Sequence, residues 1–281
     1  MNIKLIGDSC CDLSKELLER LGVSLIPLRI EVGTKQFIDD RKLELQELLS
    51  AMKSHKDAAK TSCPSPDAYA EEMRQHDESY VVTLSSRLSG SYQSAEIAKE
   101  LVQTAAPEKY IHIFDSKSAC AGQTRIMLEL RSLIDKGLSR EALVEAMEQF
   151  IAGMKTNFVL ESLDNLIKNG RVNRIVGQMA SLLSLRPIMG ADGHGEITLL
   201  EKVRGTQKAM ERLYNRVASH FSAPNVQEGP VVIAHCNCPD RAEHLRKMIL
   251  DSCNKVTEVL VVPTGGISTV YANDGGIVVA Y

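Results

Sequence analysis

The chain has 281 residues, with 33 Lys and Arg against 36 Asp and Glu, a net charge of -3, and 4% aromatic residues. A nearly balanced charge and so few aromatic rings argue against a nucleic-acid-binding function. The apolar part of the N-terminal segment is too short for a signal peptide, and no stretch has the length of a membrane span. The seven Cys are scattered and odd in number, which is typical of reduced thiols, so we expect a cytoplasmic protein.

The first half of the chain alternates between two patterns. Short apolar runs predict strands, and apolar residues at helical spacing predict the helices between them. This alternation is typical of a parallel sheet covered on both faces, so we expect a three-layer α/β domain over residues 1–153. Pro27 predicts an edge or a bulge in its strand. The predicted strands are 3–7, 23–30, 81–84 and 110–114; the predicted helices are 13–21, 45–52, 69–73, 92–101, 120–136 and 140–152; and 34–40 is predicted to be a polar loop.

Small polar residues follow several of these segments. Asp8-Ser9, Ser85-Ser86 and Asp115-Ser116 come after apolar runs, and Thr61-Ser62 lies in a turn beside one. Ligands of parallel sheets collect at the carboxyl ends of the strands. We therefore expect these four clusters to lie on one rim of the sheet.

The segment from Val81 to Ser94 is the most informative of the chain. An apolar strand ends in Ser85 and Ser86, and a helical pattern begins after Gly90. The free amides and the dipole at a helix start favour a carboxylate or a phosphate, and serine hydroxyls add hydrogen-bond donors. The segment therefore predicts an anion site, although the same serines also suit an ordinary N-cap.

The second half mixes hairpin-like strand pairs with helices. This pattern favours a mixed sheet with helices on one face, which we place in a C-terminal domain over residues 154–281. We expect the boundary near Gly153 and a ligand cleft between the two domains, because small molecules often bind at such junctions. The predicted strands are 157–162, 186–189, 196–203, 230–235, 256–262 and 276–280, and the predicted helices are 163–168, 174–184, 204–220 and 240–252.

Several stretches together resemble the DegV family in order and spacing over almost the whole chain. The serine-rich segment is the most specific of them. The stretches that carry the resemblance are Asp8-Ser9-Cys10, Thr61-Ser62-Cys63-Pro64-Ser65, Ser85-Ser86-Arg87-Leu88-Ser89-Gly90-Ser91-Tyr92-Gln93-Ser94, Asn169-Gly170-Arg171-Val172-Asn173, Leu185-Arg186-Pro187-Ile188, Asp192-Gly193 and Lys202-Val203-Arg204-Gly205.

The resemblance implies a protein that holds one long-chain fatty acid, with its acyl tail in an apolar tunnel and its carboxylate at the domain junction. It further implies possible presentation of the acid to a separate fatty acid kinase subunit, and neither an enzymatic activity of the chain itself nor a cofactor. The family residues that bind the head group match Thr61, Ser62, Ser85 and Ser86, while Ser89 and Gly90 shape the helix start.

The sequence departs from the family pattern at two positions. Val270 stands where the resemblance places a family His, and Cys63 replaces a family Gln. A valine donates no hydrogen bond, so the head group loses a donor unless Thr269, Tyr271 or Asn273 supplies one.

Other groups of residues leave alternatives open. Cys236 and Cys238 supply two of the four ligands that a site for a soft metal needs. No second pair of Cys or His at comparable spacing completes the set, so we expect no metal. A serine-dependent hydrolase or transferase using the same serines is one alternative, although no nucleophile-elbow motif is present. A regulatory or docking module with an empty cleft is another.

Four basic residues lie close together in the sequence: Lys168, Arg171, Arg174 and Arg186. Such a group is typical of a solvated face, and Arg171 and Arg174 are a weaker candidate for partner docking.

Overall fold

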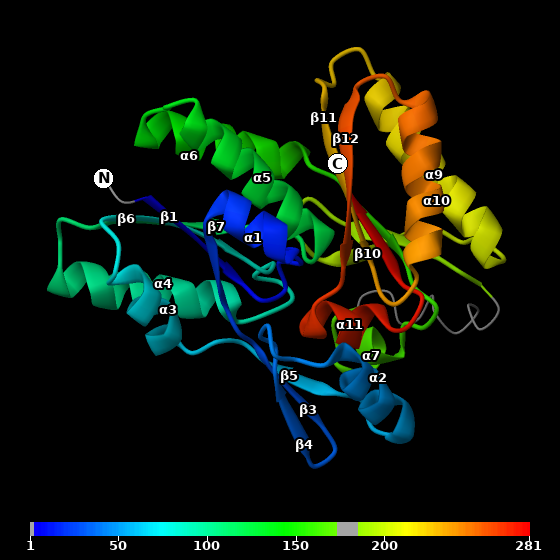
Figure 1. Ribbon diagram of the computed structural model, residues 1–281, viewed down its shortest axis with the longest axis horizontal. Helices are drawn as coiled ribbons and strands as arrows, with labels where there is room; N and C mark the ends of the chain where they lie inside the picture. The colour runs from blue at the N-terminus through cyan, green and yellow to red at the C-terminus, as the bar shows by residue number, and fades with distance from the viewer. Residues whose placement is uncertain (1–2, 173–184) are drawn as a thin grey trace.

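The computed structural model describes residues 3–172 and 185–281, which fold around two main β-sheets (Figure 1). The first sheet has four parallel strands in the order β2-β1-β6-β7. Residues on both faces of its central strands are buried, as expected of a parallel sheet. The strands are β1 (Ile3–Asp8), β2 (Val23–Ile26), β6 (Glu78–Thr83) and β7 (Tyr110–Asp115).

Helices cover both faces of this sheet, which confirms the predicted three-layer arrangement. Successive side chains of a strand point to opposite faces. Accordingly Leu5 packs with α1 (Lys15–Leu21), α5 (Ala121–Asp135) and α6 (Arg140–Gly153), whereas its neighbour Ile6 packs with α3 (Pro66–Met73) and α4 (Ser91–Ala105).

The second sheet has six strands in the order β10-β9-β8-β13-β11-β12, with only the β11–β12 pair parallel, and confirms the predicted mixed sheet. The helices α9 (Thr206–Ser222) and α10 (Pro239–Ser252) lie together on one face (Figure 1), and α5 of the first half packs on the other. The strands are β8 (Thr156–Val159), β9 (Ile188–Ala191), β10 (Ile197–Glu201), β11 (Gly229–His235), β12 (Val256–Pro263) and β13 (Ile277–Ala280).

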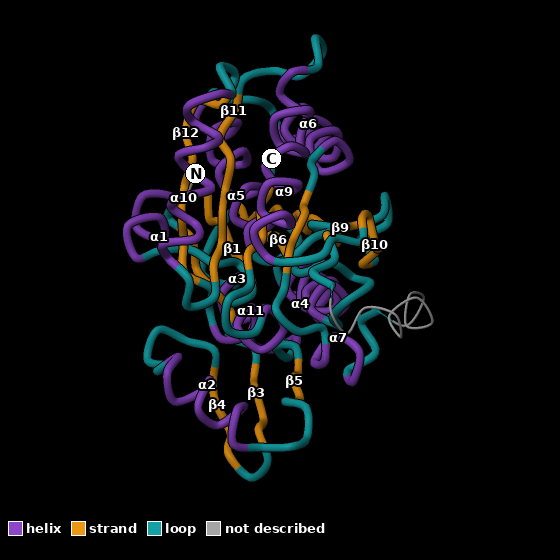
Figure 2. Tube along the Cα trace, turned by 90° about the vertical axis from the view of Figure 1, so that its right-hand side faces the viewer, coloured by secondary structure: helices purple, strands orange, loops and turns teal. Residues whose placement is uncertain are grey.

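A third, small sheet was not predicted. It has the order β4-β3-β5 and, with α2 (Leu45–Ser54), projects at the bottom of Figure 2. The single strand predicted over 23–30 is wrong, because the chain leaves the first sheet at Pro27 and enters the small one. The polar loop predicted over 34–40 is also wrong, because it contains the edge strand β4. The strands are β3 (Arg29–Val32), β4 (Lys35–Ile38) and β5 (Lys60–Ser62).

Two short helices, α7 (Asp164–Lys168) and α11 (Gly266–Ala272), lie near the junction of the sheets (Figure 1). α7 was predicted, and α11 was not. The helix predicted over 174–184 lies outside the described residues. α6 ends at Gly153 and β8 begins at Thr156; we keep a domain boundary between them as a proposal.

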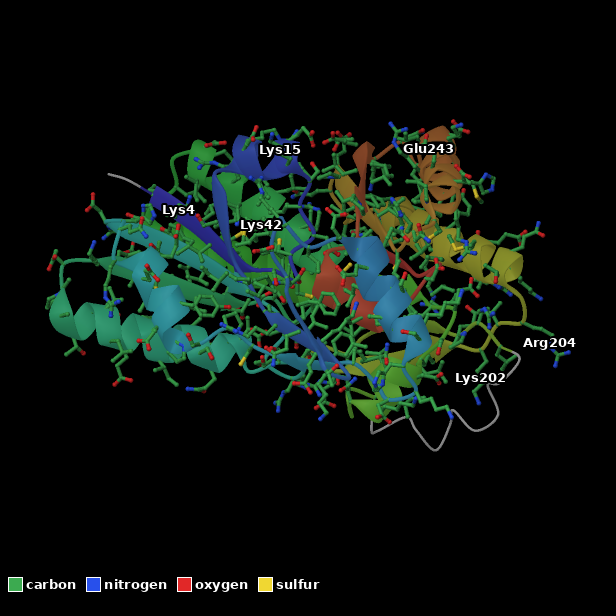
Figure 3. All side chains as sticks on the ribbon, turned by 60° about the horizontal axis from the view of Figure 1, so that its bottom comes forward. Lys4, Lys15, Lys42, Lys202, Arg204 and Glu243 are labelled. Carbon is green, nitrogen blue, oxygen red and sulfur yellow. The ribbon has the colours of Figure 1, made fainter. Side chains whose placement is uncertain are left out.

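Charged side chains lie mainly at the surface. Lys42, Lys202 and Arg204 are exposed, and Lys202 and Arg204 lie at the right-hand edge of the molecule in Figure 3. Within residues 3–172 and 185–281, no helix is both long enough and apolar enough to cross a membrane.

Candidate functional site

A cavity lined mainly by apolar side chains lies where the two main sheets meet. Junctions of this kind are a common place for small-molecule sites. Loops that follow β6 and β7 form its wall on one side, and β8, the β9–β10 hairpin, α11 and β13 form the other. The lining residues are Cys10, Leu84, Leu88, Lys117, Ser118, Ala119, Cys120, Thr156, Phe158, Leu160, Leu166, Arg171, Gly190, Ala191, Gly195, Ile197, Ile267, Ser268, Tyr271, Ala272 and Val278.

The surface that faces the cavity is mostly apolar, although several lining residues are polar. Their polar groups bond to other protein groups instead of facing the cavity. The hydroxyl oxygens of Ser118 and Thr156 lie 2.7 Å apart. The Cys120 thiol donates to Asp12 Oδ2 at 2.7 Å, behind the wall. These groups are satisfied without a ligand, so an occupant of the cavity meets mostly carbon.

Tyr271 lines the cavity, and its hydroxyl group bonds to that of Thr61, which is not itself a lining residue. The two oxygens lie 2.8 Å apart, with Thr61 on β5 and Tyr271 on α11. Arg171 also lines the cavity, and its guanidinium donates to the Leu88 carbonyl at 3.2 Å. A hydroxyl group and a guanidinium are donors of the kind that bind a carboxylate.

The predicted serine turn lies beside the cavity, but its serine hydroxyls bond to protein groups. Ser85 is fully buried and donates to the Gly195 carbonyl of the β9–β10 hairpin at 2.8 Å. Ser86 is exposed and donates to Asp115 Oδ2 at 2.5 Å. From this turn, it is Leu84 and Leu88 that line the cavity.

The other predicted head-group residues lie further from the lining. Ser62 is exposed at the end of β5. The Ser89 hydroxyl lies 3.0 Å from that of Ser91, at the start of α4. A Cβ on Gly90 would approach Cys63 Sγ to 3.0 Å, so glycine permits the close packing of these two loops. Direct contact of Ser62, Ser89 or Gly90 with a ligand stays a prediction.

Three of the four polar clusters expected on one rim meet there, whereas Thr61-Ser62 lies in β5 of the small sheet. Asp8 accepts hydrogen bonds from the Leu84 amide at 2.6 Å and from Gln123 Nε2 at 3.0 Å. Ser86 reaches Asp115, as described above, because β1, β6 and β7 are neighbours in the sheet. Burial raises the pKa of Asp8 to about 6, against the lowering effect of these hydrogen bonds.

Tyr271 was predicted only as one of three alternative hydrogen-bond donors. Val270, aligned with the family His, is fully buried in a core cluster with Ile30 and Leu48. The next residue of α11, Tyr271, lines the cavity instead. The only signal in the sequence was that Tyr271 is one of three possible donors near that position.

Cysteines and basic residues that the structure describes bond to other protein groups. In the part of the chain that the structure describes, no group of three or more His, Cys, Asp or Glu side chains is placed to hold a metal. The Cys238 thiol donates to the Gly276 carbonyl. Arg186 forms an ion pair with Glu161 at 2.7 Å, and Arg174 lies outside the described residues.

The fold and the cavity define a class of α/β protein in which two sheets enclose an apolar chamber at their junction. The family model described as "Uncharacterised protein, DegV family" matches residues 2–281. The chain therefore belongs to the DegV family, as the sequence motifs predicted.

Relatives of known structure extend this comparison. A DegV-family protein of Ruminococcus gnavus, crystallised with vaccenic acid, is 40% identical with a TM-score of 0.93, covering 99% of each chain. The Fatty Acid Kinase (Fak) B3 protein of Streptococcus pneumoniae, loaded with linoleic acid, is 31% identical with a TM-score of 0.89, covering 100% of this chain and 99% of that one. A DegV domain-containing protein of the same species is 33% identical over 284 residues, which covers 100% of this chain and 99% of the relative.

Proposed function

We propose that this protein binds one long-chain fatty acid, with the acyl tail in the cavity between the two main sheets. The observation that carries the proposal is the cavity itself, whose polar lining residues bond to one another or to the protein behind them. Each methylene buried in such a wall contributes roughly 0.8 kcal/mol. Two relatives with the same fold, at 40% and 31% identity, hold vaccenic and linoleic acid.

We propose that the Thr61–Tyr271 hydroxyl pair binds the carboxylate, with the Arg171 cation beside it. The support is that Tyr271 and Arg171 line the cavity and that Thr61 touches Tyr271. Ser62, Ser85, Ser86, Ser89 and Gly90 complete the proposed head-group region. Of these, Ser85 already donates to a backbone carbonyl, so its proposed part is to hold the turn that presents Leu84 and Leu88.

We further propose a binding protein rather than an enzyme, one that presents the acid to a separate kinase in the cytoplasm. The name of the Fak B3 protein assigns that relative to a fatty acid kinase. A serine hydrolase would need a base at its nucleophile, whereas the buried Ser85 donates to a backbone carbonyl. Ser86 donates to the Asp115 carboxylate, but it is exposed and does not line the cavity. All seven cysteines are free, which suits a reducing compartment.

Native mass spectrometry of the purified protein tests the proposal. We expect a mass increment of one fatty acid per chain, lost on delipidation and restored by added oleic acid. Displacement of a fluorescent fatty acid then gives the affinity, and methyl oleate, which lacks the carboxylate, serves as the matched ligand control. Protein that takes up neither oleic acid nor palmitic acid after delipidation contradicts the proposal.

A further inference from the structure

The short helix α11 contributes much of one cavity wall. Ile267, Ser268, Tyr271 and Ala272 all line the cavity, and they occupy successive turns of this one helix. A shift or rotation of α11 therefore changes the shape of the cavity and the position of the Tyr271 hydroxyl at the same time.

Two carboxylates hold the beginning of α11. Asp39 accepts hydrogen bonds from the Gly266 amide at 2.7 Å and from the Ile267 amide at 3.0 Å, one on each oxygen. Asp12 accepts from the Gly265 amide at 2.7 Å. Three consecutive backbone donors thus bond to two side chains that come from the first forty residues of the chain.

Asp39 and the first residues of α11 are closely packed. Asp39 is only 6% exposed, and burial raises the pKa of its carboxyl group. A Cβ on Gly266 would come within 2.6 Å of Asp39 Oδ1 and closer still to Leu43, so only glycine fits there. A buried carboxylate that accepts two amide hydrogen bonds fixes both its own position and that of the helix.

The small sheet holds α11 at two points. Asp39 follows β4, and Thr61 lies in β5. Both strands pair with β3, where Arg29 is opposite Ile38 and Ile30 is opposite Thr61. The small sheet and the residue that follows it therefore contact the first residues of α11 through Asp39 and the Tyr271 hydroxyl through Thr61 (Figure 1 shows α11 beside β3, β5 and α2).

We propose that Asp39, with Asp12 beside it, is a positioning residue for ligand binding, which sets α11 so that Tyr271 meets Thr61 at the cavity. This inference rests on the proposed function. Asp39 touches no ligand in this scheme, and it acts only through the backbone of α11.

A double-mutant cycle on the full chain tests the inference. Asp39→Asn keeps the shape of the side chain but removes its charge and one acceptor. We expect it to weaken oleic acid binding about tenfold, the effect of losing one charged hydrogen bond. Tyr271→Phe alone is expected to weaken binding less, and the two changes together are expected to cost no more than Asp39→Asn alone, because both act through one contact. Additive losses, or unchanged affinity in Asp39→Asn, overturn the inference.

Two controls separate positioning from general destabilisation. Glu78→Gln alters another buried carboxylate, which bonds Tyr80 and Arg140 away from the cavity, and should lower stability without changing affinity. Asp12→Asn is the second test variant should Asp39→Asn fold poorly, with the same non-additivity expected toward Tyr271→Phe.

Hydrogen exchange of the ligand-free protein gives a readout that does not depend on binding. Asp39→Asn should speed exchange in Gly266–Ala272 selectively, with the four-stranded sheet unchanged. If wild-type protein binds no fatty acid, the proposed function fails while this measurement still tests the role of Asp39. Exchange that rises equally throughout the chain, or not at all in α11, refutes the positioning role.

Discussion

Asp12 should make the protein more stable as the pH falls from 8 to 6.5. Its carboxyl group is 3% exposed, and burial raises its pKa to about 7, far above the 3.8 of an exposed aspartate. A folded-state pKa above the unfolded value means that the folded protein binds the proton more tightly, so stability is gained as pH falls through 7. The contribution is present in full below pH 3.8 and is lost as pH rises.

The size of the effect follows from that pKa. Linkage gives about 0.8 kcal/mol more stability from Asp12 at pH 6.5 than at pH 8, and Asp8, with a pKa of about 6, adds about 0.2 kcal/mol. For a chain of this length, 0.8 kcal/mol corresponds to about 2 °C in Tm. Below pH 6.5 the half-buried His112, His220 and His235 oppose the trend, because partial burial lowers each pKa and the folded state resists their protonation.

The measurement is therefore a difference between variants. Urea unfolding of delipidated wild-type protein and of Asp12→Asn, followed by circular dichroism at pH 8 and 6.5, isolates the contribution of this one group. We expect the pH difference to shrink by about 0.8 kcal/mol in Asp12→Asn, and to be unchanged in Asp57→Asn, an exposed carboxylate. An Asp12→Asn profile that parallels the wild type would refute the reasoning.

Three other substitutions have matched partners in the chain. Ser85→Ala leaves the buried Gly195 carbonyl without its donor and should lower the unfolding free energy by about 2 kcal/mol, whereas Ser86→Ala, at an exposed site, should change it little; equal losses in urea unfolding would contradict this. Gly195→Ala should destabilise by about 2 kcal/mol or more, since its φ is +88° and a Cβ would lie 2.8 Å from Lys117 Cα. Gly193→Ala meets open space and should be nearly neutral in thermal unfolding. Thr61→Ala should weaken fatty acid binding about fivefold through loss of one hydroxyl contact, while Thr34→Ala, in the exposed turn of the same small sheet, should leave the displacement curve unchanged.

The main sheets could be predicted because their patterns are local. β6 is buried throughout, and its apolar run is bounded by polar residues at both ends. β4 was missed because it is a four-residue edge strand in which only Phe37 is buried. α11 was missed because it begins in a pair of glycines and its amides bond Asp39 and Asp12, which are more than 220 residues away in the chain. No local pattern encodes a helix end held by such remote side chains.

The candidate site, too, could be predicted only in part. The sequence indicated hydroxyl groups near a strand-to-helix junction, and in the structure Thr61 bonds Tyr271 whereas Ser85 and Ser86 bond Gly195 and Asp115. Sequence alone does not tell which hydroxyl faces a cavity and which faces a backbone carbonyl. Ser85 bonds Gly195 across 110 residues, so its partner depends on how the second sheet docks on the first.

In the proposed binding mode, the tail and the carboxylate of a fatty acid make different contributions to the binding free energy. The tail contacts a wall whose hydroxyls and thiols bond to protein groups, so its contribution grows by roughly 0.8 kcal/mol with each methylene that fits. In the proposed head-group site, the Thr61–Tyr271 pair has one hydroxyl proton left to donate, and a hydrogen bond to a charged acceptor contributes about 1.5–3 kcal/mol. Affinity therefore comes mainly from the tail, whereas the head-group pair selects an acid over an ester and fixes the depth at which the chain lies. A cavity with donors at one place along its wall accepts tails of many shapes while holding every carboxylate at the same point, which is the geometry that presentation to a second protein requires.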